Sequence, residues 1–305
     1  MRPEAYVENN ADLFSYVNNR SPGTVASFVS PALPGLSLAT NQASYPVLIY
    51  SHGGGFRRQN TDKALELASH GYIVVAMDHP WALASVFPDG KVVLGTEICF
   101  DPKACFQPAL DDGIKDIRFV LDELSQLNLN DALFAGRLDM ERLGAFGFSL
   151  GRVMVAEFGR IDARCRAVAM LDAGWVLEAA IDLDRQGLHK PFLSMNDEIA
   201  PSTLPSPPGY DPNWLSASLA LFAKATNNAF WCQIEESRHQ SFQDRGSLVS
   251  EPRRTSDPTP ASRAQSETIR ACIVSFFDKY LKDEDDGLLE NPGAIHTNII
   301  NFQRK

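Results

Sequence analysis

Short, continuous apolar runs alternate with longer amphipathic segments along most of this chain. A run that is apolar at every position fits a strand covered on both faces, since a strand with one face in water alternates apolar and polar residues. The segments between the runs carry apolar residues at helical spacing. This repetition predicts an α/β fold with a mostly parallel sheet and helices on both faces.

The predicted elements follow these two patterns. The strands are PVLIYS (46–51), YIVVAM (72–77), RLGAFGF (142–148), RAVAML (166–171), PFLSM (191–195) and AFWCQIE (229–235). The helices are expected over 62–69, 110–127, 150–158, 213–225 and 264–281. Three stretches, 79–107, 201–212 and 247–262, are expected to be surface loops, which often build the substrate site of an α/β sheet. Within the first, Asp89-Gly90 between apolar residues predicts a small hairpin.

Composition sets the expected domain count and excludes some partners. The 305 residues, 44% of them hydrophobic, show no repeat and no low-complexity linker, so we expect one domain over 1–305 with loop insertions. The chain has 28 Lys and Arg against 38 Asp and Glu, a formal net charge of −10. Such a charge repels phosphate backbones and anionic lipids, which argues against nucleic acid as a partner.

The expected compartment is the cytoplasm. The first segment, MRPEAYVENNADLFSYVNNR, lacks the apolar core of a secretory signal, and no other window approaches a transmembrane span, so no stable membrane insertion is expected. Five cysteines without a C-x-x-C pair predict neither a zinc site nor a disulfide framework. Cys99 and Cys105 are close enough in sequence to pair within a loop, although an intracellular chain more often keeps such thiols reduced.

Residues 147–151, Gly-Phe-Ser-Leu-Gly, fit the pattern G-x-S-x-G. They follow a predicted strand and precede a predicted helix. In that setting the glycines permit a sharp turn that presents the serine hydroxyl at the helix N-terminus. We therefore predict that Ser149 is a catalytic nucleophile; the alternative is an ordinary glycine-rich turn.

A second glycine-rich segment, SHGGG (51–55), directly follows the first predicted strand. An acyl-transfer serine needs backbone N–H groups aimed at the tetrahedral oxyanion, and glycine lets the main chain approach the substrate closely. We assign the amides of Gly54 and Leu150 as the two donors. A phosphate-binding loop is the weaker alternative, because no G-K-[ST] follows.

A base and two candidate acids lie downstream of the serine. Of the six histidines, His239 follows the last predicted strand, where the base arrives in the chain order serine, acid, histidine. Asp172 and Asp197 each end a predicted strand between the serine and that histidine. Either carboxylate would hold the imidazole tautomer and stabilise the imidazolium, and chain order leaves both open.

The segments YPVLIYSHGGGFR, ELASHGYIVVAMDHPWALAS, GAFGFSLG, AMLDAGW and RHQSF occur in this order between about residues 45 and 281. Together they resemble the platelet-activating-factor acetylhydrolase family, particularly its fungal and bacterial members. The resemblance implies an α/β-hydrolase fold and ester hydrolysis without a cofactor or metal. It also implies a triad of Ser149, Asp172 and His239, and so favours Asp172 over Asp197 as the acid.

The chain departs from the family pattern at two places. Family members usually follow the serine motif with a second small residue, S-x-G-G, whereas Arg152 follows Gly151 here. A cation of this length must reach a polar group of the substrate or pair with a carboxylate, with a surface salt bridge as the alternative. At the N-terminus only GTVASFVS (23–30) is available as an edge strand. The sheet would then be smaller, or a partner such as a second copy in a homodimer would cover its edge.

The expected function is cleavage of a small-molecule carboxylic ester (short acyl or phospholipid-like) or a lactone through an acyl-enzyme. Residues expected to contact the substrate are Gly55, Phe56, Trp81, Phe148, Arg152 and Trp175. Two alternatives stay open. One is a natural-product biosynthetic hydrolase or cyclase that uses the same serine, and the other is a non-catalytic binding protein that keeps the hydrolase fold.

Overall fold

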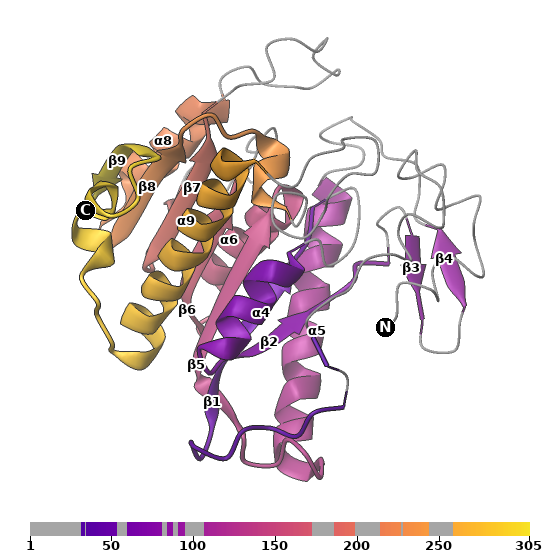
Figure 1. Cartoon of the computed structure of the whole chain (residues 1–305). Helices are drawn as coiled ribbons and strands as arrows, with labels where there is room; N and C mark the ends of the chain where they lie inside the picture. Colours follow the sequence, from indigo (N-terminus) through magenta and orange to yellow (C-terminus); the bar gives the residue numbers. More distant parts are fainter. Residues whose placement is uncertain are drawn as a thin grey trace.

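The computed structural model describes residues 32–33, 35–53, 60–80, 84–87, 91–94, 107–172, 186–198, 214–226, 228–243 and 259–305. Their centre is a seven-stranded sheet with the order β2-β1-β5-β6-β7-β8-β9 (Figure 1). Its strands are β1 (Tyr45–Ser51), β2 (Ile73–Ala76), β5 (Leu138–Phe148), β6 (Cys165–Leu171), β7 (Phe192–Asp197), β8 (Ala229–Ile234) and β9 (Ile299–Arg304). Neighbours from β2 to β8 pair in parallel, and β9 pairs antiparallel with β8.

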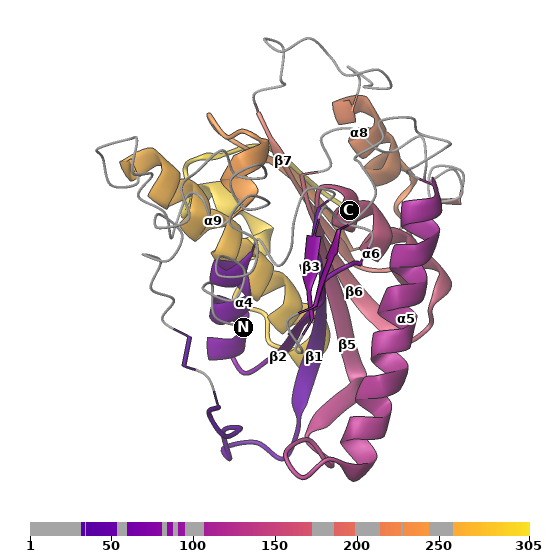
Figure 2. The ribbon, with the colours of Figure 1, turned by 90° about the vertical axis from the view of Figure 1, so that its right-hand side faces the viewer.

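Helices cover both faces of the sheet, so the predicted α/β architecture is confirmed. One face carries α5 (Gln107–Asn130), α6 (Leu150–Ile161) and α8 (Trp214–Lys224). The other face carries α4 (Thr61–Ser69) and α9 (Pro260–Phe277), and Figure 2 shows the sheet between the two layers. β1, β7 and β8 are buried at every residue because apolar side chains on both of their faces meet a helical layer.

Each predicted strand and helix is present, with some boundaries moved. The predicted helix 264–281 is formed by α9 and a following π-helix, η4 (Asp278–Lys282), and the predicted loop 247–262 ends earlier because α9 begins at Pro260. The predicted hairpin is confirmed by the antiparallel pair β3 (Ala84–Val86) and β4 (Val92–Leu94). Three short 3-10 helices complete the described elements: η2 (His239–Phe242), η5 (Leu288–Glu290) and η6 (Pro292–Ala294).

Two predicted segments cannot be compared, and one strand was not predicted. The stretches 23–30 and 201–212 lie outside the described residues. β9 escaped prediction because it is a half-exposed edge strand whose sequence, IINFQR, has neither a continuous apolar run nor a clear alternation.

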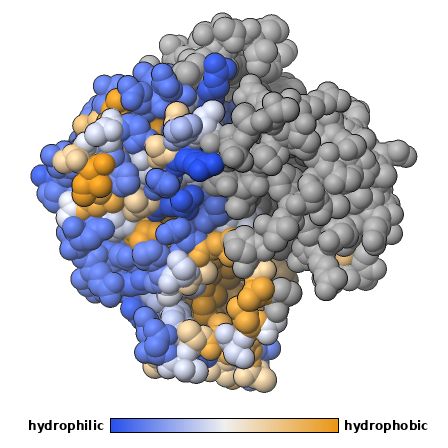
Figure 3. Space-filling model, in the orientation of Figure 1, coloured by the Kyte–Doolittle hydropathy of each residue, from blue (hydrophilic) through white to orange (hydrophobic). Residues whose placement is uncertain are grey.

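Within the described part, β2 forms the other edge of the sheet. All four of its residues are partly exposed. In Figure 3, apolar side chains gather at this side of the molecule beside α4, whereas the surface over α9 is mostly hydrophilic. No helix in the described ranges is both long enough and apolar enough to cross a membrane.

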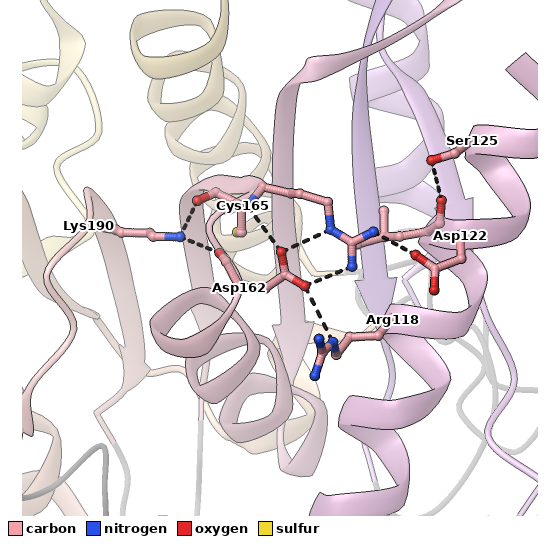
Figure 4. Close-up of polar contacts among 8 residues, drawn as sticks. Arg118, Asp122, Ser125, Asp162, Cys165 and Lys190 are labelled. Atoms are coloured by element: carbon pink, nitrogen blue, oxygen red, sulfur yellow. Dashed lines mark hydrogen bonds and ion pairs between the residues drawn. The ribbon is translucent and has the colours of Figure 1, made fainter.

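A polar cluster fastens the end of α6 to α5, at the end of the sheet where β6 begins (Figure 4). Asp162, which is only 7% exposed, accepts hydrogen bonds from Arg164 at 2.9 and 2.8 Å and forms an ion pair with Arg118 at 3.6 Å. Lys190 donates to the main-chain oxygens of Asp162 and Cys165, both at 2.5 Å. The hydrogen bond from Arg164 is the main cause that lowers the pKa of Asp162.

Replacing Asp162 by Asn should therefore destabilise the protein in a pH-dependent way. A carboxylate with a lowered pKa adds stability above its unfolded-state pKa and loses that contribution as pH falls through the folded value. At pH 7 we expect Asp162→Asn to cost about 1–2 kcal/mol. Thermal unfolding should show this difference shrinking below about pH 4. A difference that stays constant from pH 7 to pH 3 would contradict the role assigned to the carboxylate charge.

Candidate active site

Ser149 occupies the turn between β5 and α6. Its backbone has φ 56° and ψ −122°, a left-handed conformation that is costly for a residue other than glycine and that often occurs at functional sites. The turn is held from the neighbouring strand, because the Ser149 N–H donates to the carbonyl oxygens of Leu171 and Asp172, both at 3.1 Å. The hydroxyl group therefore lies at the N-terminus of α6, where the helix dipole favours negative charge.

The end of β1 packs directly against this turn. A Cβ atom at Gly151 would collide with the carbonyl oxygens of Ser51 and His52, and one at Gly53 would lie 2.9 Å from the Ser149 Cβ. Both positions require glycine because backbone or the serine itself fills the space. The predicted adjacency of the glycine-rich segment and the serine turn is therefore present as far as Gly53.

Ser149, His239 and Asp172 form one hydrogen-bonded chain of side chains. The His239 Nε2 lies 3.1 Å from the Ser149 Oγ, and the His239 Nδ1 lies 2.5 Å from the Asp172 Oδ2. Asp172 is fully buried, whereas the His239 side chain is 23% exposed. Elements far apart in sequence supply the three groups: the β5–α6 turn, the end of β6, and the 3-10 helix η2 after β8.

Asp197 lies beside this chain at the end of β7. Its N–H approaches the Asp172 Oδ1 at 3.4 Å, and its main-chain oxygen accepts a hydrogen bond from the Gln233 side chain at 3.0 Å. The two aspartates that chain order could not separate are therefore neighbours with different contacts. Asp172 contacts the imidazole ring, whereas Asp197 contacts Asp172 and Gln233 through its main chain.

Burial is the main cause that raises the pKa of Asp197 to about 8, and the negative charge of Asp172 adds to it. The His239 amide and the positive charge of Arg152 act in the opposite direction. Asp197 therefore tends to keep its proton in the folded state at a pH where the unfolded chain has lost it.

The predicted substrate contacts are only partly described. Gly54, Gly55, Phe56, Trp81 and Trp175 lie outside the described residues, as do Cys99 and Cys105. Leu150 begins α6 and is 4% exposed. Phe148 is buried, with its ring centroid 4.6 Å from that of the His239 imidazole, so it packs against the histidine ring.

The environment of Arg152 matches none of the three that the sequence suggested: a substrate contact, an ion pair with a carboxylate or a surface salt bridge. The structure places its side chain in the interior, 1% exposed, where it donates to Asn196 Oδ1 at 2.7 Å and to the hydroxyl groups of Ser194 and Ser218 at 3.1 and 2.9 Å. It therefore forms neither a surface salt bridge nor an ion pair with a carboxylate among the described residues. The expected contact with substrate is corrected for the same reason, since the side chain is buried and both of its terminal nitrogens donate to protein oxygens.

A second chain of Ser, His and Asp side chains supports the end of β1, and sequence reasoning did not single it out. The His79 Nε2 lies 2.9 Å from the Ser51 Oγ, and the His79 Nδ1 lies 2.8 Å from Asp116 on α5. The His79 N–H also donates to the His52 Nε2 at 3.0 Å. Ser51 and His79 are fully buried, so this chain braces the glycine-rich segment. The available signal was the position of His79 two residues after the end of a predicted strand.

Among the described residues, no group of three or more His, Cys, Asp or Glu side chains is placed to hold a metal ion. Cys165, Cys232 and Cys272 are free and buried. Burial raises the pKa of Cys165 and of Cys272 to about 12, which makes both thiols unreactive.

The sheet, the serine turn and the downstream histidine together define an α/β-hydrolase fold. A solved structure described as a ferulic acid esterase from Streptomyces cinnamoneus shares this fold. The TM-score is 0.75 at 24% identity, covering 97% of this chain and 83% of the other.

The predicted resemblance to platelet-activating-factor acetylhydrolases is confirmed by comparison with known sequences. A family model described as platelet-activating factor acetylhydrolase, isoform II, matches residues 8–87. The chain is 24% identical over 268 residues to a probable 1-alkyl-2-acetylglycerophosphocholine esterase of Arthroderma benhamiae, covering 84% of this chain and 65% of that protein. It is 25% identical over 256 residues to a platelet-activating factor acetylhydrolase of Gallus gallus, covering 72% and 57%. The chain therefore spans about two thirds or less of these relatives.

Replacing Asp197 by Asn should change how stability depends on pH. In the wild type the folded state holds a proton that the unfolded chain releases above about pH 4, so this group lowers the free energy of unfolding as pH rises from about 4 to 8. Asn does not titrate, so the variant does not lose this part of the free energy of unfolding as pH rises. Thermal unfolding should show the stability of Asp197→Asn, relative to wild type, increasing from pH 5 to pH 8. A relative stability that falls over this interval would mean that Asp197 is ionised in the folded state.

Proposed function

We propose that this chain is a serine carboxylic-ester hydrolase, with Ser149 as nucleophile, His239 as general base and Asp172 as the acid that orients it. The observation that carries the proposal is the continuous hydrogen-bonded path from the Ser149 hydroxyl through the imidazole to a buried carboxylate. The hydrolase fold and the esterase and acetylhydrolase relatives support the same chemistry. A non-catalytic member would have no need to keep a strained serine joined to this path.

In the proposed reaction, the His239 Nε2 takes the proton from the Ser149 hydroxyl as its oxygen attacks the ester carbonyl. The amides of Leu150 and Gly54 stabilise the oxyanion, and the helix N-terminus favours the same charge. The imidazolium then gives its proton to the departing alcohol. Water, activated by the same imidazole, releases the acid from the acyl-enzyme.

Asp172 is preferred as the acid because its Oδ2 contacts the His239 Nδ1 and so holds the proton on that nitrogen. Asp197 has no hydrogen bond to the imidazole among the described residues, and burial raises the pKa of its carboxyl group. A protonated carboxyl group cannot stabilise an imidazolium by charge. The different environments of the two aspartates thus separate their roles.

The proposed substrates are small esters, with a short acyl group as the first choice. One relative is named a probable 1-alkyl-2-acetylglycerophosphocholine esterase and the solved structure a ferulic acid esterase, so both names describe esterases. Gly55, Phe56, Trp81 and Trp175 remain proposed contacts of the acyl or alcohol group. Arg152 is buried and bonded to protein groups, so it gives no reason to prefer a biosynthetic cyclase, and hydrolysis is the function we propose.

Ser149→Ala should lower kcat for a short p-nitrophenyl ester by at least about a thousandfold, because it removes the nucleophile. Wild-type turnover by this variant would reject the assignment. A matched control is Ser51→Ala, which removes the serine of the buried second chain. It should still form the acyl-enzyme, visible as an initial burst of p-nitrophenol or an acyl adduct by mass spectrometry.

Reaction with a fluorophosphonate probe tests whether Ser149 is activated, independently of the substrate. The wild type should form one adduct per chain, and peptide mass spectrometry should locate it at Ser149. His239→Ala should lose the adduct because the base is gone. Folded wild-type protein that forms no adduct would favour the non-catalytic alternative.

The two aspartates give a direct test of the acid. Asp172→Asn should lower kcat by about a thousandfold or more, because an amide cannot stabilise the imidazolium and allows the wrong tautomer. Asp197→Asn should lower it by no more than about tenfold, since Asp172 and not Asp197 is hydrogen-bonded to the imidazole ring. Steady-state kinetics of both variants should show this order. The reverse order would move the acid to β7.

A further inference from the structure

Two hydrogen bonds hold the imidazole of His239, and both lie at the edge of its ring. The Nδ1 is 2.5 Å from Asp172 and the Nε2 is 3.1 Å from Ser149. These bonds fix where the two nitrogens lie, but not the tilt of the ring about the line through them. Tilt turns the N–H and the lone pair away from their partners, and a misaligned hydrogen bond weakens steeply. A base held in this way needs a further contact on a face of its ring.

The side chain of Phe148 makes such a contact. The centroid of its ring is 4.6 Å from that of the His239 imidazole, and the two ring planes differ by 31°, so the rings are stacked with a tilt. Stacked ring pairs at this separation attract each other beyond the effect of burial alone. Phe148 is 1% exposed, whereas the His239 side chain is 23% exposed. The phenyl ring therefore supports the imidazole from the interior of the protein.

The phenyl ring is itself held on two sides. Phe148 is the last residue of β5, and its main chain lies opposite Leu171 in the parallel pair with β6. A Cβ atom at Gly53 would lie 3.4 Å from the Phe148 Cδ1, so the end of β1 is beside this ring. A ring whose backbone belongs to the sheet and whose edge meets a second strand end has little room to move. It can therefore fix the orientation of the ring that stacks on it.

We propose that Phe148 is a positioning residue that fixes the tilt of the His239 imidazole and so keeps it aligned with the serine hydroxyl and the buried carboxylate. The proposal rests on the function proposed above for the Ser149, His239 and Asp172 side chains. Phe148 directly precedes the nucleophile in the chain, so one turn carries both the serine and the support of its base. In this role Phe148 acts through the imidazole and not through the substrate contact expected from the sequence.

The test compares three variants. Phe148→Leu keeps an apolar side chain and removes the flat face. Phe148→Met also lacks a flat face, and its flexible side chain fills irregular space, so it takes the place of Phe148→Leu if that variant fails to fold. Phe146→Leu is the matched control, because Phe146 lies two residues earlier in β5, is also buried in the same apolar cluster, and has its ring against Tyr50 and Phe277.

With p-nitrophenyl acetate, we expect Phe148→Leu to lower kcat by about thirtyfold and to keep KM within about threefold of wild type. The base acts in both formation and hydrolysis of the acyl-enzyme, so a tilted ring slows both steps and leaves their ratio nearly unchanged. The rate of fluorophosphonate labelling at Ser149 should fall by a similar factor, because it needs the same base. Phe146→Leu should keep kcat and the labelling rate within about threefold of wild type, even where its melting temperature falls as far.

A direct contact between Phe148 and the substrate predicts different kinetics. Phe148→Leu would then raise KM at unchanged kcat, or would alter the preference between p-nitrophenyl acetate and butyrate at an unchanged labelling rate. Either result would overturn the proposal. An unchanged kcat in Phe148→Leu, or an equal loss of kcat in Phe146→Leu, would overturn it as well.

Thermal unfolding separates failure of this proposal from failure of the proposed function. Absence of both ester turnover and a fluorophosphonate adduct on wild type would reject the function. The ring contact can still be tested in an inactive protein, by combining each leucine variant with His239→Ala. Phe148→Leu and His239→Ala should together lower the melting temperature by less than the sum of their separate effects, because either change alone removes the stacking. The effects of Phe146→Leu and His239→Ala should add, and additive effects for the Phe148 pair would overturn the proposal.

Discussion

The close contact between the end of β1 and the first turn of α6 is the constraint on which the site depends. At Gly151 the carbonyl oxygens of β1 occupy the space of a side chain, and at Gly53 the serine itself does so. This contact supports the left-handed backbone of Ser149 and places Gly53 beside its side chain. The strain at Ser149 persists because strands β1, β5 and β6 surround it and leave no relaxed alternative.

Two buried polar systems support the two sides of this contact. Asp116, His79 and Ser51 brace the end of β1, while Asp172, Asp197 and the His239 loop occupy the ends of β6, β7 and β8. In both systems a histidine joins a carboxylate to a serine. The two systems differ in solvent exposure, because Ser51 and His79 are fully buried, whereas the His239 side chain is partly exposed. The same three residue types therefore have a structural role at the end of β1, whereas at Ser149 their arrangement is suited to catalysis.

The elements and the serine turn could be predicted because each has a local cause. Continuous apolar runs indicate buried parallel strands. The glycines around Ser149 indicate a sharp turn between a strand and a helix. β9 had no comparable sequence pattern, since half of its residues face solvent. Its pairing with β8 depends on the path of the chain after α9, which is not a local property. Asp172 and Asp197 could not be separated by residues alone, because both end parallel strands and the choice depends on which one the His239 ring meets.

Arg152 shows why a buried charge is harder to infer than a motif. Arg152 lies in the first turn of a helix that begins at the site, and this place in the sequence suggests an exposed cation. The side chain is buried because β7 and α8 cover it. The groups that receive it, Ser194 and Asn196 in β7 and Ser218 in α8, lie more than forty residues away in the chain. A lone polar residue in an apolar strand or helix carries no separate signal. The cation and its acceptors can be understood only together, because a buried guanidinium needs polar groups around it and these groups come from β7 and α8.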